Sequence, residues 1–323
     1  MNSPRQSKLW HVLGAGAMGC LWAGALREAG HEVTLLLRDA RSLEAFRSGR
    51  GITLLEGDQR RLVHCDADLA EAPRAPFDRL LICCKAHQTL AAFSVVAPQL
   101  RAGALVLLVQ NGMGVAEELL KQRPDLRLCC GVSTDGAHRI APFTVRRAGR
   151  GVTLLGLFPR EATQLTGAAL CGELDQQLLA LQSSHDIYRA QWQKLAVNSV
   201  INPLTAIYDI RNGELPAHPG CRQWIPPLCQ EVEAVSRSQG IDLSAHQLQQ
   251  RVAEICLSTA GNVSSMLQDI RQRRQTEIDY INGYLLRVGR QYGLECPSHR
   301  QLATRVAAAA SGHLVDDGAG SDG

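Results

Sequence analysis

Apolar runs of strand length alternate with helical stretches through the first half of the chain. One run at residues 9–13 is followed by a glycine-rich turn, a helix that ends near Ala29 and a second run at 32–37. The other elements expected here are strands at 79–84, 104–109 and 127–132, a hairpin of 143–147 with 151–155, and helices at 87–99 and 114–122. Strands that alternate with helices favour a doubly wound, mostly parallel sheet.

Beyond about residue 160 the pattern becomes helical. Apolar positions recur at helical spacing up to residue 310, after a polar break at residues 182–187. The sequence therefore predicts an α/β Rossmann-type dinucleotide-binding domain followed by an all-α domain. We expect the first over residues 1–185, the second over 186–310 and a disordered tail over 311–323.

The composition is ordinary for a globular protein, with 45% apolar and 20% charged residues and a net charge of +3. So small a charge, without a run of Lys or Arg, argues against a nucleic-acid partner or a membrane surface. The eleven cysteines are scattered, and the adjacent pairs Cys83-Cys84 and Cys129-Cys130 lack zinc spacing. We expect buried free thiols, with both pairs in strands, and no metal. Without a secretory signal or an 18-residue apolar span, the chain is expected to be soluble and cytoplasmic.

The glycine-rich turn carries the first candidate chemistry. It follows a strand and opens a helix, and a second strand completes the unit, which is the context of a dinucleotide-binding fingerprint. We expect Gly14 to form the tight turn, Gly16 to let the backbone approach a pyrophosphate, and Gly19 to let the helix pack closely. A purely structural glycine loop is the alternative. The predicted phosphate-binding segment is Gly14-Ala15-Gly16-Ala17-Met18-Gly19.

The residue after the second strand indicates which dinucleotide is bound. NAD-binding domains place an acidic residue there, whereas this chain has Arg38, a cation suited to the 2′-phosphate of NADP. Asp39 comes one residue after the position where NAD-binding domains place their acidic residue. Lys85 and Asn111 directly follow two further strands, so both are expected to face the same crevice. The sequence predicts NADPH/NADP as the cofactor.

A second candidate site is a polar stripe on an apolar helix. Lys194, Asn198 and Asn202 recur every four residues, which places them on one helical face. Unpartnered polar groups on a buried helix are costly, so a polar ligand is expected there. The alternatives are a lysine that reaches solvent and asparagines that bond neighbouring helices. Because Asn202 precedes Pro203, we expect a kink that opens backbone groups beside the ligand.

Taken in order along residues 14–283, these motifs resemble those of the ketopantoate reductases (2-dehydropantoate 2-reductases). The matching pieces are G-A-G-A-M-G, L-R, C-K-A-H-Q, Q-N-G-M-G, W-x-K-L-A-V-N-S-V-I-N-P-L-T-A-I, R-N-G-E-L and S-S-M-L-Q-D-I-R-Q-R-R-Q-T-E-I-D-Y-I-N-G. The resemblance implies reduction of the C2 ketone of ketopantoate to (R)-pantoate by NADPH, on the route to pantothenate and coenzyme A. The chain departs from the family's usual Thr-rich run at residues 133–138, which puts loop contacts near Ala137 in question.

The resemblance also implies roles for single residues. Lys194 would be the general acid that protonates the C2 oxygen, and Glu277 would lie beside this lysine and the nicotinamide. The residues expected to bind substrate are Asn111, Lys194, Asn198, Asn202, Asn212 and Ser265. Those expected to hold NADPH are residues 14–19 with Arg38, Lys85, Asn111, Glu277 and the backbone around Ala137.

The chemistry of these residue types agrees with those roles. Hydride addition builds negative charge on the ketone oxygen, so a positioned ammonium suits the task of proton donor. Burial would lower the pKa of Lys194, and a nearby Glu277 would oppose that shift. Ser265 with Gln268 also fits a capping box. On a straight helix, Glu277 would lie about 18 Å from Ser265. Ser265 and Glu277 can therefore contact the same small substrate only if that helix lies across the substrate cleft, or if its Ser265 end is not regular helix.

Several alternatives stay open on the sequence. A different 2-oxo or 3-hydroxy acid dehydrogenase would share the dinucleotide-binding half and a catalytic lysine. A non-catalytic NADP-binding regulator would bind NADPH without turnover, and a paralogue would act on an altered substrate. The chain is expected to act on a small molecule, as a monomer or a homodimer.

Overall fold

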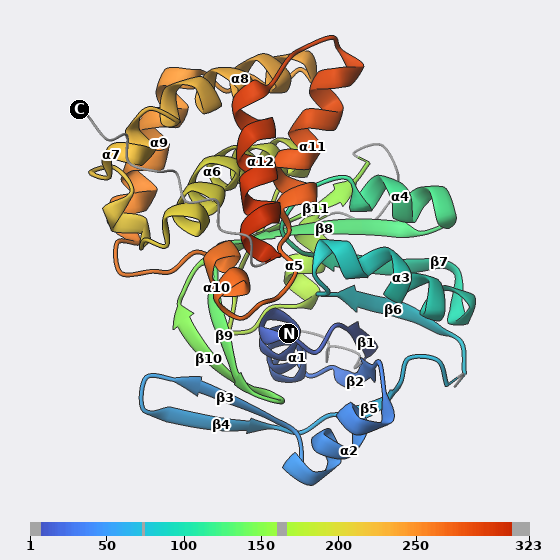
Figure 1. Ribbon diagram of the computed structural model, residues 1–323. Coiled ribbons are helices and arrows are strands. Elements are labelled where there is room, and N and C mark those ends of the chain that lie inside the picture. Colours follow the sequence, from blue (N-terminus) through green and yellow to red (C-terminus); the bar gives the residue numbers. More distant parts are fainter. Residues whose placement is uncertain (1–7, 73–74, 160–166, 312–323) are drawn as a thin grey trace, which may run out of the picture. The chain divides into compact units, whose positions relative to one another are not determined.

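The computed structural model describes residues 8–72, 75–159 and 167–311. The chain divides into two compact units, Met1–Ala190 and Gln191–Gly323, whose elements are labelled in Figure 1. Apart from Ser311, the tail predicted at 311–323 lies outside the described residues.

An eight-stranded sheet forms the centre of the first unit. Its order is β12-β11-β8-β7-β6-β1-β2-β5, and all neighbours run parallel except β8 and β11. The predicted doubly wound, mostly parallel sheet is thereby confirmed. The strands are β1 (Leu9–Leu13), β2 (Glu32–Leu37), β5 (Asp66–Leu69), β6 (Phe77–Ile82), β7 (Leu100–Val109), β8 (Arg127–Ser133), β11 (Val152–Phe158) and β12 (Ala180–Ser183).

Along the chain, helices connect the strands of this sheet. They are α1 (Ala17–Glu28), α2 (Ala40–Gly49), α3 (Ala86–Val96), the 3-10 helix η1 (Ala97–Gln99), α4 (Val115–Gln122) and α5 (Gly167–Glu173). Helix α1 packs between the large sheet and a second sheet, and its residues 19–26 are all buried. A helix covered on every side is apolar all round, which explains the uniformly apolar sequence after the glycine turn.

The second sheet has the order β4-β3-β10-β9 and was not expected. Its strands are β3 (Ile52–Glu56), β4 (Gln59–Val63), β9 (Gly136–Ala141) and β10 (Thr144–Gly149). The predicted hairpin of 143–147 with 151–155 is wrong, because β10 pairs with β9 while β11 joins the large sheet. The residues of β9 are half-buried or exposed, so this strand carries no apolar alternation that would have revealed it.

The second unit is helical throughout its described residues. Its elements are α6 (Ile187–Tyr208, beginning in the first unit), the 3-10 helix η2 (Asn212–Glu214), α7 (Pro219–Arg222), α8 (Ile225–Ser238), α9 (Ala245–Ser258), α10 (Ser265–Arg271), α11 (Ile278–Gln291) and α12 (Pro297–Ala310). The predicted all-α part is confirmed, but the expected loss of strands beyond residue 160 is wrong, since β12 adds a parallel edge strand to the first unit. None of the described helices is long and apolar enough to cross a membrane.

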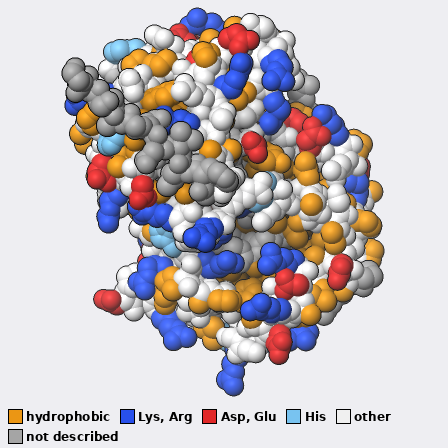
Figure 2. All heavy atoms as spheres, viewed as in Figure 1, with side chains coloured by type: hydrophobic (Ala, Val, Ile, Leu, Met, Phe, Trp, Pro, Cys, Tyr) orange, Lys and Arg blue, Asp and Glu red, His pale blue; other side chains and the backbone are white. Residues whose placement is uncertain are grey.

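The surface and the cysteines agree with an ordinary globular chain. On the face shown in Figure 2, acidic and basic side chains are interspersed. All eleven cysteines are among the described residues and none forms a disulfide. Cys129 and Cys130 lie in β8 as predicted, whereas Cys83 and Cys84 lie just past the end of β6 and not within a strand.

Candidate functional site

The connections of the large sheet reverse direction beside β1. From β1 the chain passes to β2 on one side, and β6 later pairs with β1 on the other side. Leu13 is level with Leu36 and with Ile82, so these parallel strands end at the same edge. In open α/β sheets such a switch point is where ligands bind, outside the carboxyl ends of the strands.

The glycine turn lies at this switch point. Gly14 has φ +100°, and a Cβ there would lie 2.6 Å from the backbone nitrogen of Cys84. A Cβ on Gly19 would overlap the carbonyl oxygen of Gly14, so α1 approaches the turn as closely as the sequence predicts. A Cβ on Gly16, by contrast, would meet no atom within 4 Å. The conformational roles expected of Gly14 and Gly19 are confirmed.

The N-terminus of α1 is suited to an anion. Its N-cap, Gly16, has no side chain to accept from the first amides, and the first turn contains no acidic residue. Helix amides without side-chain acceptors, together with the helix dipole, attract phosphate. Ala15, Ala17 and Met18 are half-buried and pack against the apolar core, so the residues that support this turn are themselves held in place.

Arg38 and Asp39 divide two tasks at the end of β2. Asp39 is the N-cap of α2 and accepts from the backbone nitrogen of Ser42 at 2.7 Å. Hydrogen bonds from the side chain and the backbone nitrogen of Ser42, with a further one from Nε of Arg38 at 2.8 Å, lower the pKa of Asp39 to about 2. The Arg38 side chain is 86% exposed, so its guanidinium is accessible to a ligand. Asp39 caps α2, whereas the Arg38 guanidinium is the accessible cation at this strand end.

The next two strand ends are joined through one threonine. Lys85 is the N-cap of α3 and is half-buried. The hydroxyl of Thr89 donates to the Lys85 carbonyl at 3.1 Å and lies 2.8 Å from Oε1 of Gln110, the residue before Asn111. Thr89 is fully buried. It therefore links the backbone of Lys85 to the side chain of Gln110, which precedes Asn111.

Ala137 lies apart from these strand ends in the bonding pattern. It belongs to β9 of the four-stranded sheet, opposite Arg147 of β10, and packs against the apolar core around α1. The departure from the family's sequence at residues 133–138 thus spans the end of β8, the connecting residues 134–135 and the first residues of β9.

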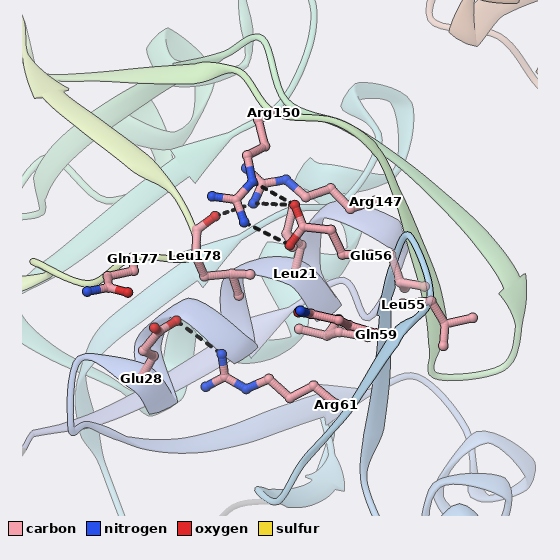
Figure 3. A pocket seen from close by; sticks show the side chains of 12 residues that line it. Leu21, Glu28, Leu55, Glu56, Gln59, Arg61, Arg147, Arg150, Gln177 and Leu178 are labelled. Carbon is pink, nitrogen blue, oxygen red and sulfur yellow. Dashed lines mark hydrogen bonds and ion pairs between the residues drawn. The ribbon is translucent and has the colours of Figure 1, made fainter.

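A pocket of about 250 Å³ in the first unit does not coincide with the predicted site (Figure 3). Its charged side chains pair with one another, since Arg150 contacts Glu56 at 2.7 Å and Arg61 contacts Glu28 at 3.2 Å. These matched charges create no demand for a ligand. The pocket is lined by Leu21, Glu28, Leu54, Leu55, Glu56, Gln59, Arg61, Val145, Arg147, Arg150, Gln177 and Leu178.

In the second unit, the polar stripe lies on α6 as predicted. Lys194 and Asn198 are half-buried and Asn202 is 7% exposed, while Leu195, Val200 and their apolar neighbours are buried. The helix runs from Ile187 to Tyr208 with Pro203 in its interior. The expectation that backbone opens beside a ligand at Pro203 is wrong, because Nδ2 of Asn282 donates to the Ser199 carbonyl at 2.9 Å.

Asn212 presents a hydrogen-bond acceptor whose orientation follows from its neighbours. The hydroxyl of Thr259 donates to the Ile255 carbonyl at 2.6 Å, so it accepts from Nδ2 of Asn212 at 2.9 Å. This places Oδ1 of Asn212 on the other side, buried and without a partner among the described residues. The backbone of Asn212 is also held, since its nitrogen donates to the Asn262 carbonyl at 3.0 Å.

Ser265 and Glu277 lie on two different helices. The N-cap of α10 is Ser264, which accepts from the nitrogen of Leu267 at 3.2 Å, so the predicted capping box at Ser265 is wrong. Ser265 is the first helical residue and is exposed. Helix α10 ends at Arg271, and the chain turns before Glu277, which is the N-cap of α11 and 7% exposed. Ser265 and Glu277 are therefore not on one continuous helix, and the distance of about 18 Å expected along a straight helix does not apply to them.

Hydrogen bonds bring the polar segments of this unit together. The hydroxyl of Thr205 on α6 lies 2.8 Å from that of Ser264. The turn at Asn262 is bonded to Asn212 at the start of η2. The segments around Asn202, Asn212 and Ser265 are therefore neighbours within this unit.

Comparison with known families agrees with both halves of this description. Residues 10–160 match the family model described as "Ketopantoate reductase PanE/ApbA", and residues 186–310 match "Ketopantoate reductase PanE/ApbA C terminal". The chain belongs to the ketopantoate reductase family. Curated relatives named 2-dehydropantoate 2-reductase include those of Escherichia coli O157:H7, 40% identical over 91% of this chain and 93% of the relative, and Yersinia pestis, 37% identical over 90% and 91%.

Solved structures of the ketopantoate reductase family share the fold. The PanE/ApbA family ketopantoate reductase from Ralstonia eutropha JMP134 has a TM-score of 0.84 at 28% identity, over 94% of this chain and 99% of that one. D-mandelate dehydrogenase, solved with NADH and anilino(oxo)acetate, has a TM-score of 0.86 at 24% identity, over 95% and 100%. The second likeness shows the fold alone.

Three residues that matter to the local geometry were not singled out from the sequence. Thr89 joins two strand ends, Thr259 orients Asn212, and Asn282 bonds the middle of α6. Asn282 stands in the final D-Y-I-N-G of a ketopantoate reductase motif, which was the available signal. Thr89 and Thr259 carry no comparable signal, because a threonine in a helix or at its end usually bonds the helix backbone.

Proposed function

We propose that this chain reduces 2-dehydropantoate (ketopantoate) to (R)-pantoate with NADPH. The observation that carries the proposal is its similarity to relatives named 2-dehydropantoate 2-reductase, at 37–40% identity over nine-tenths of the chain. The polar stripe of α6 and the glycine turn of β1–α1 support the proposal, because they fit the substrate site and the cofactor site that this reaction needs.

The residues of the first unit fit a dinucleotide phosphate. We infer that the segment 14–19 holds the pyrophosphate, because Gly16 leaves room for it and the first amides of α1 have no acidic competitor. Arg38 would bind the 2′-phosphate, with Lys85, Asn111, Glu277 and the backbone of Ala137 completing the contacts. When bound, NADPH supplies the hydride that reduces the ketone.

Lys194 is the proposed proton donor. As the ketone is reduced, charge develops on the C2 oxygen, and an ammonium at that point stabilises the charge and transfers its proton. Glu277 is buried at the start of α11, and we infer that its carboxylate holds the ammonium in position. The other two side chains of the stripe, Asn198 and Asn202, are amides and cannot serve as the acid.

The substrate would be held by Asn111, Asn198, Asn202, Asn212 and Ser265. The buried Oδ1 of Asn212 supports a division of labour among them. A desolvated acceptor is satisfied only by a donor, and the hydroxyl of ketopantoate is a donor, whereas its carboxylate is not. We therefore propose that Asn212 binds the hydroxyl, while the carboxylate is bound by donors such as the exposed hydroxyl of Ser265.

The cellular setting is part of the same proposal. We infer a cytoplasmic enzyme acting on a small molecule, without a nucleic-acid partner, as a monomer or a homodimer. Sedimentation of the purified protein across a concentration series distinguishes the two association states.

The experiment that tests the activity is NADPH oxidation with a panel of 2-oxo acids. The panel contains ketopantoate, its analogue without the C4 hydroxyl, and phenylglyoxylate. We expect turnover with ketopantoate, and a loss of about 10²-fold or more in kcat/KM for the deoxy analogue, which leaves a buried acceptor unpaired. Preference for another acid would indicate a related reductase. Tight NADPH binding without turnover would indicate a regulator, and either result would overturn the proposal.

A further inference from the structure

The proline inside α6 leaves one buried carbonyl without its helical donor. In a regular helix the carbonyl of Ser199 accepts from the nitrogen four residues later, which here belongs to Pro203 and carries no hydrogen. Ser199 is fully buried, so water does not replace that bond. The affected carbonyl belongs to the residue after Asn198, within the helix that carries the stripe proposed to bind substrate.

The side chain of Asn282 occupies this position. It is fully buried on α11, and its Nδ2 donates to the Ser199 carbonyl at 2.9 Å. The same Nδ2 lies 2.9 Å from Nδ1 of His299, so its second hydrogen is directed at that ring nitrogen. A carbonyl only accepts, so the amide nitrogen and not Oδ1 must face Ser199. The bond therefore replaces the missing backbone donor.

His299 fixes the orientation of the Asn282 side-chain amide. Its Nε2 faces the Leu228 carbonyl at 3.2 Å and must carry the ring hydrogen, which makes Nδ1 the acceptor for Asn282. The backbone nitrogens of Ser298 and His299 donate to the Glu231 carboxylate at 2.8 and 3.0 Å. Helices α8 and α12 thus hold His299, His299 holds Asn282, and Asn282 holds α6.

We propose that Asn282 is a positioning residue for the reaction. It replaces the amide that Pro203 lacks and thereby sets Asn198 and Asn202 in register with Glu277, which begins the helix that carries Asn282. The inference rests on the proposed function, because it assigns these residues to substrate and proton transfer. Asn282 itself acts through α6 and is assigned no contact with substrate or cofactor.

A double-substitution cycle tests this role. Asn282→Ala removes the donor, and Pro203→Ala restores a backbone N–H four residues after Ser199. We expect Asn282→Ala alone to lower kcat/KM for ketopantoate about 10- to 100-fold, since small misplacements of reacting groups are costly. The Kd for NADPH, measured by fluorescence, should be unchanged. In the Pro203→Ala background the same substitution should cost about threefold or less.

The matched control is Leu285→Ala, which truncates another fully buried side chain of α11 without removing a hydrogen bond. Its effect should be the same in the wild type and in the Pro203→Ala background, so the two substitutions should be additive. If Asn282→Ala does not fold but the double variant folds and turns over, the proposal is supported. Equal losses for Asn282→Ala in both backgrounds, or a double variant that does not fold, would overturn it.

The two proposals fail in different ways. If the wild type does not reduce ketopantoate, the proposed function is wrong, but the coupling between positions 203 and 282 is still measurable in urea unfolding. If the wild type is active and Asn282→Ala loses only stability, with kcat/KM retained by the folded protein, Asn282 is structural and the positioning role is wrong.

Discussion

Arg38 is the residue that we propose selects NADPH over NADH. Its neighbour Asp39 could have been mistaken for the acidic residue of an NAD site, but its carboxylate caps α2. The exposed Arg38 guanidinium is then the group at the strand end that can meet a phosphate. The distinction was predictable from the order Leu-Arg-Asp, whereas the capping role of Asp39 is visible only in the structure.

Replacing Arg38 by Ala should weaken NADPH binding about 10- to 100-fold, as expected for loss of a hydrogen bond to a charged group. NADH has no 2′-phosphate, so its Kd should be unchanged. Isothermal titration with both cofactors measures the difference. Arg47→Ala, an exposed arginine near the other end of α2, is the control and should alter neither Kd. Equal losses for NADPH and NADH in Arg38→Ala would contradict the phosphate role.

At the residue scale, candidate groups were predictable where the polar side chain stood against an apolar pattern. Lys194, Asn198 and Asn202 are conspicuous because their helix is otherwise buried, and the structure keeps all three on α6. The partner of the Ser199 carbonyl was not predictable, because Asn282 is distant in sequence and its bond depends on how two helices pack. Sequence patterns report which face is buried, not which atom meets which.

Among the elements, the β1–α1 turn separates two effects of glycine. Gly16→Ala should leave the thermal stability near that of the wild type, because the added methyl group meets no atom of the protein. It should raise the Kd for NADPH, because the methyl group would occupy the space assigned to phosphate. Gly19→Ala should lower the melting temperature, because its methyl group would overlap the Gly14 carbonyl.

Thermal unfolding with and without NADPH distinguishes these outcomes. We expect NADPH to raise the melting temperature of Gly16→Ala only slightly. For Gly19→Ala we expect a lower melting temperature than that of the wild type in the absence of NADPH. A Gly16→Ala variant that binds NADPH as tightly as the wild type would show that the cofactor does not approach this backbone.

The elements that sequence patterns identify are those with one clear periodicity. The large sheet was predicted because its central strands are continuous apolar runs, as in a parallel sheet covered on both faces. The four-stranded sheet was missed because β4 and β9 are mostly exposed and show no alternation of buried apolar and exposed polar residues. Its parallel pair, β3 with β10, also joins residues that are far apart in the chain, and no local pattern encodes that pairing.

At the scale of the whole molecule, one buried histidine makes stability depend on pH. Burial lowers the pKa of His299 from 6.5 to about 4, with the Glu231 carboxylate opposing the shift. As the pH falls, the His299 ring is therefore protonated near pH 6.5 in the unfolded chain but only near pH 4 in the folded protein. The pH window between these two values is where stability changes. The contribution to stability is complete above this window, is lost as pH falls through it, and is constant below it.

Urea unfolding between pH 7.5 and 4 tests this dependence. The free energy of unfolding of the wild type should fall relative to that of His299→Gln by up to about 3 kcal/mol over the window. Glutamine retains an acceptor for Asn282 and does not titrate. Parallel pH profiles for the two proteins would contradict the requirement for a neutral ring.

We propose that Lys194 delivers a proton to ketopantoate as NADPH reduces it. The most direct measurement is the initial rate of NADPH oxidation at saturating ketopantoate, for the wild type and Lys194→Ala. We expect turnover by the wild type and a loss of about 10²- to 10⁴-fold in kcat for the variant, with the Kd for NADPH unchanged. No turnover by the wild type, or an undiminished rate in Lys194→Ala, would contradict it.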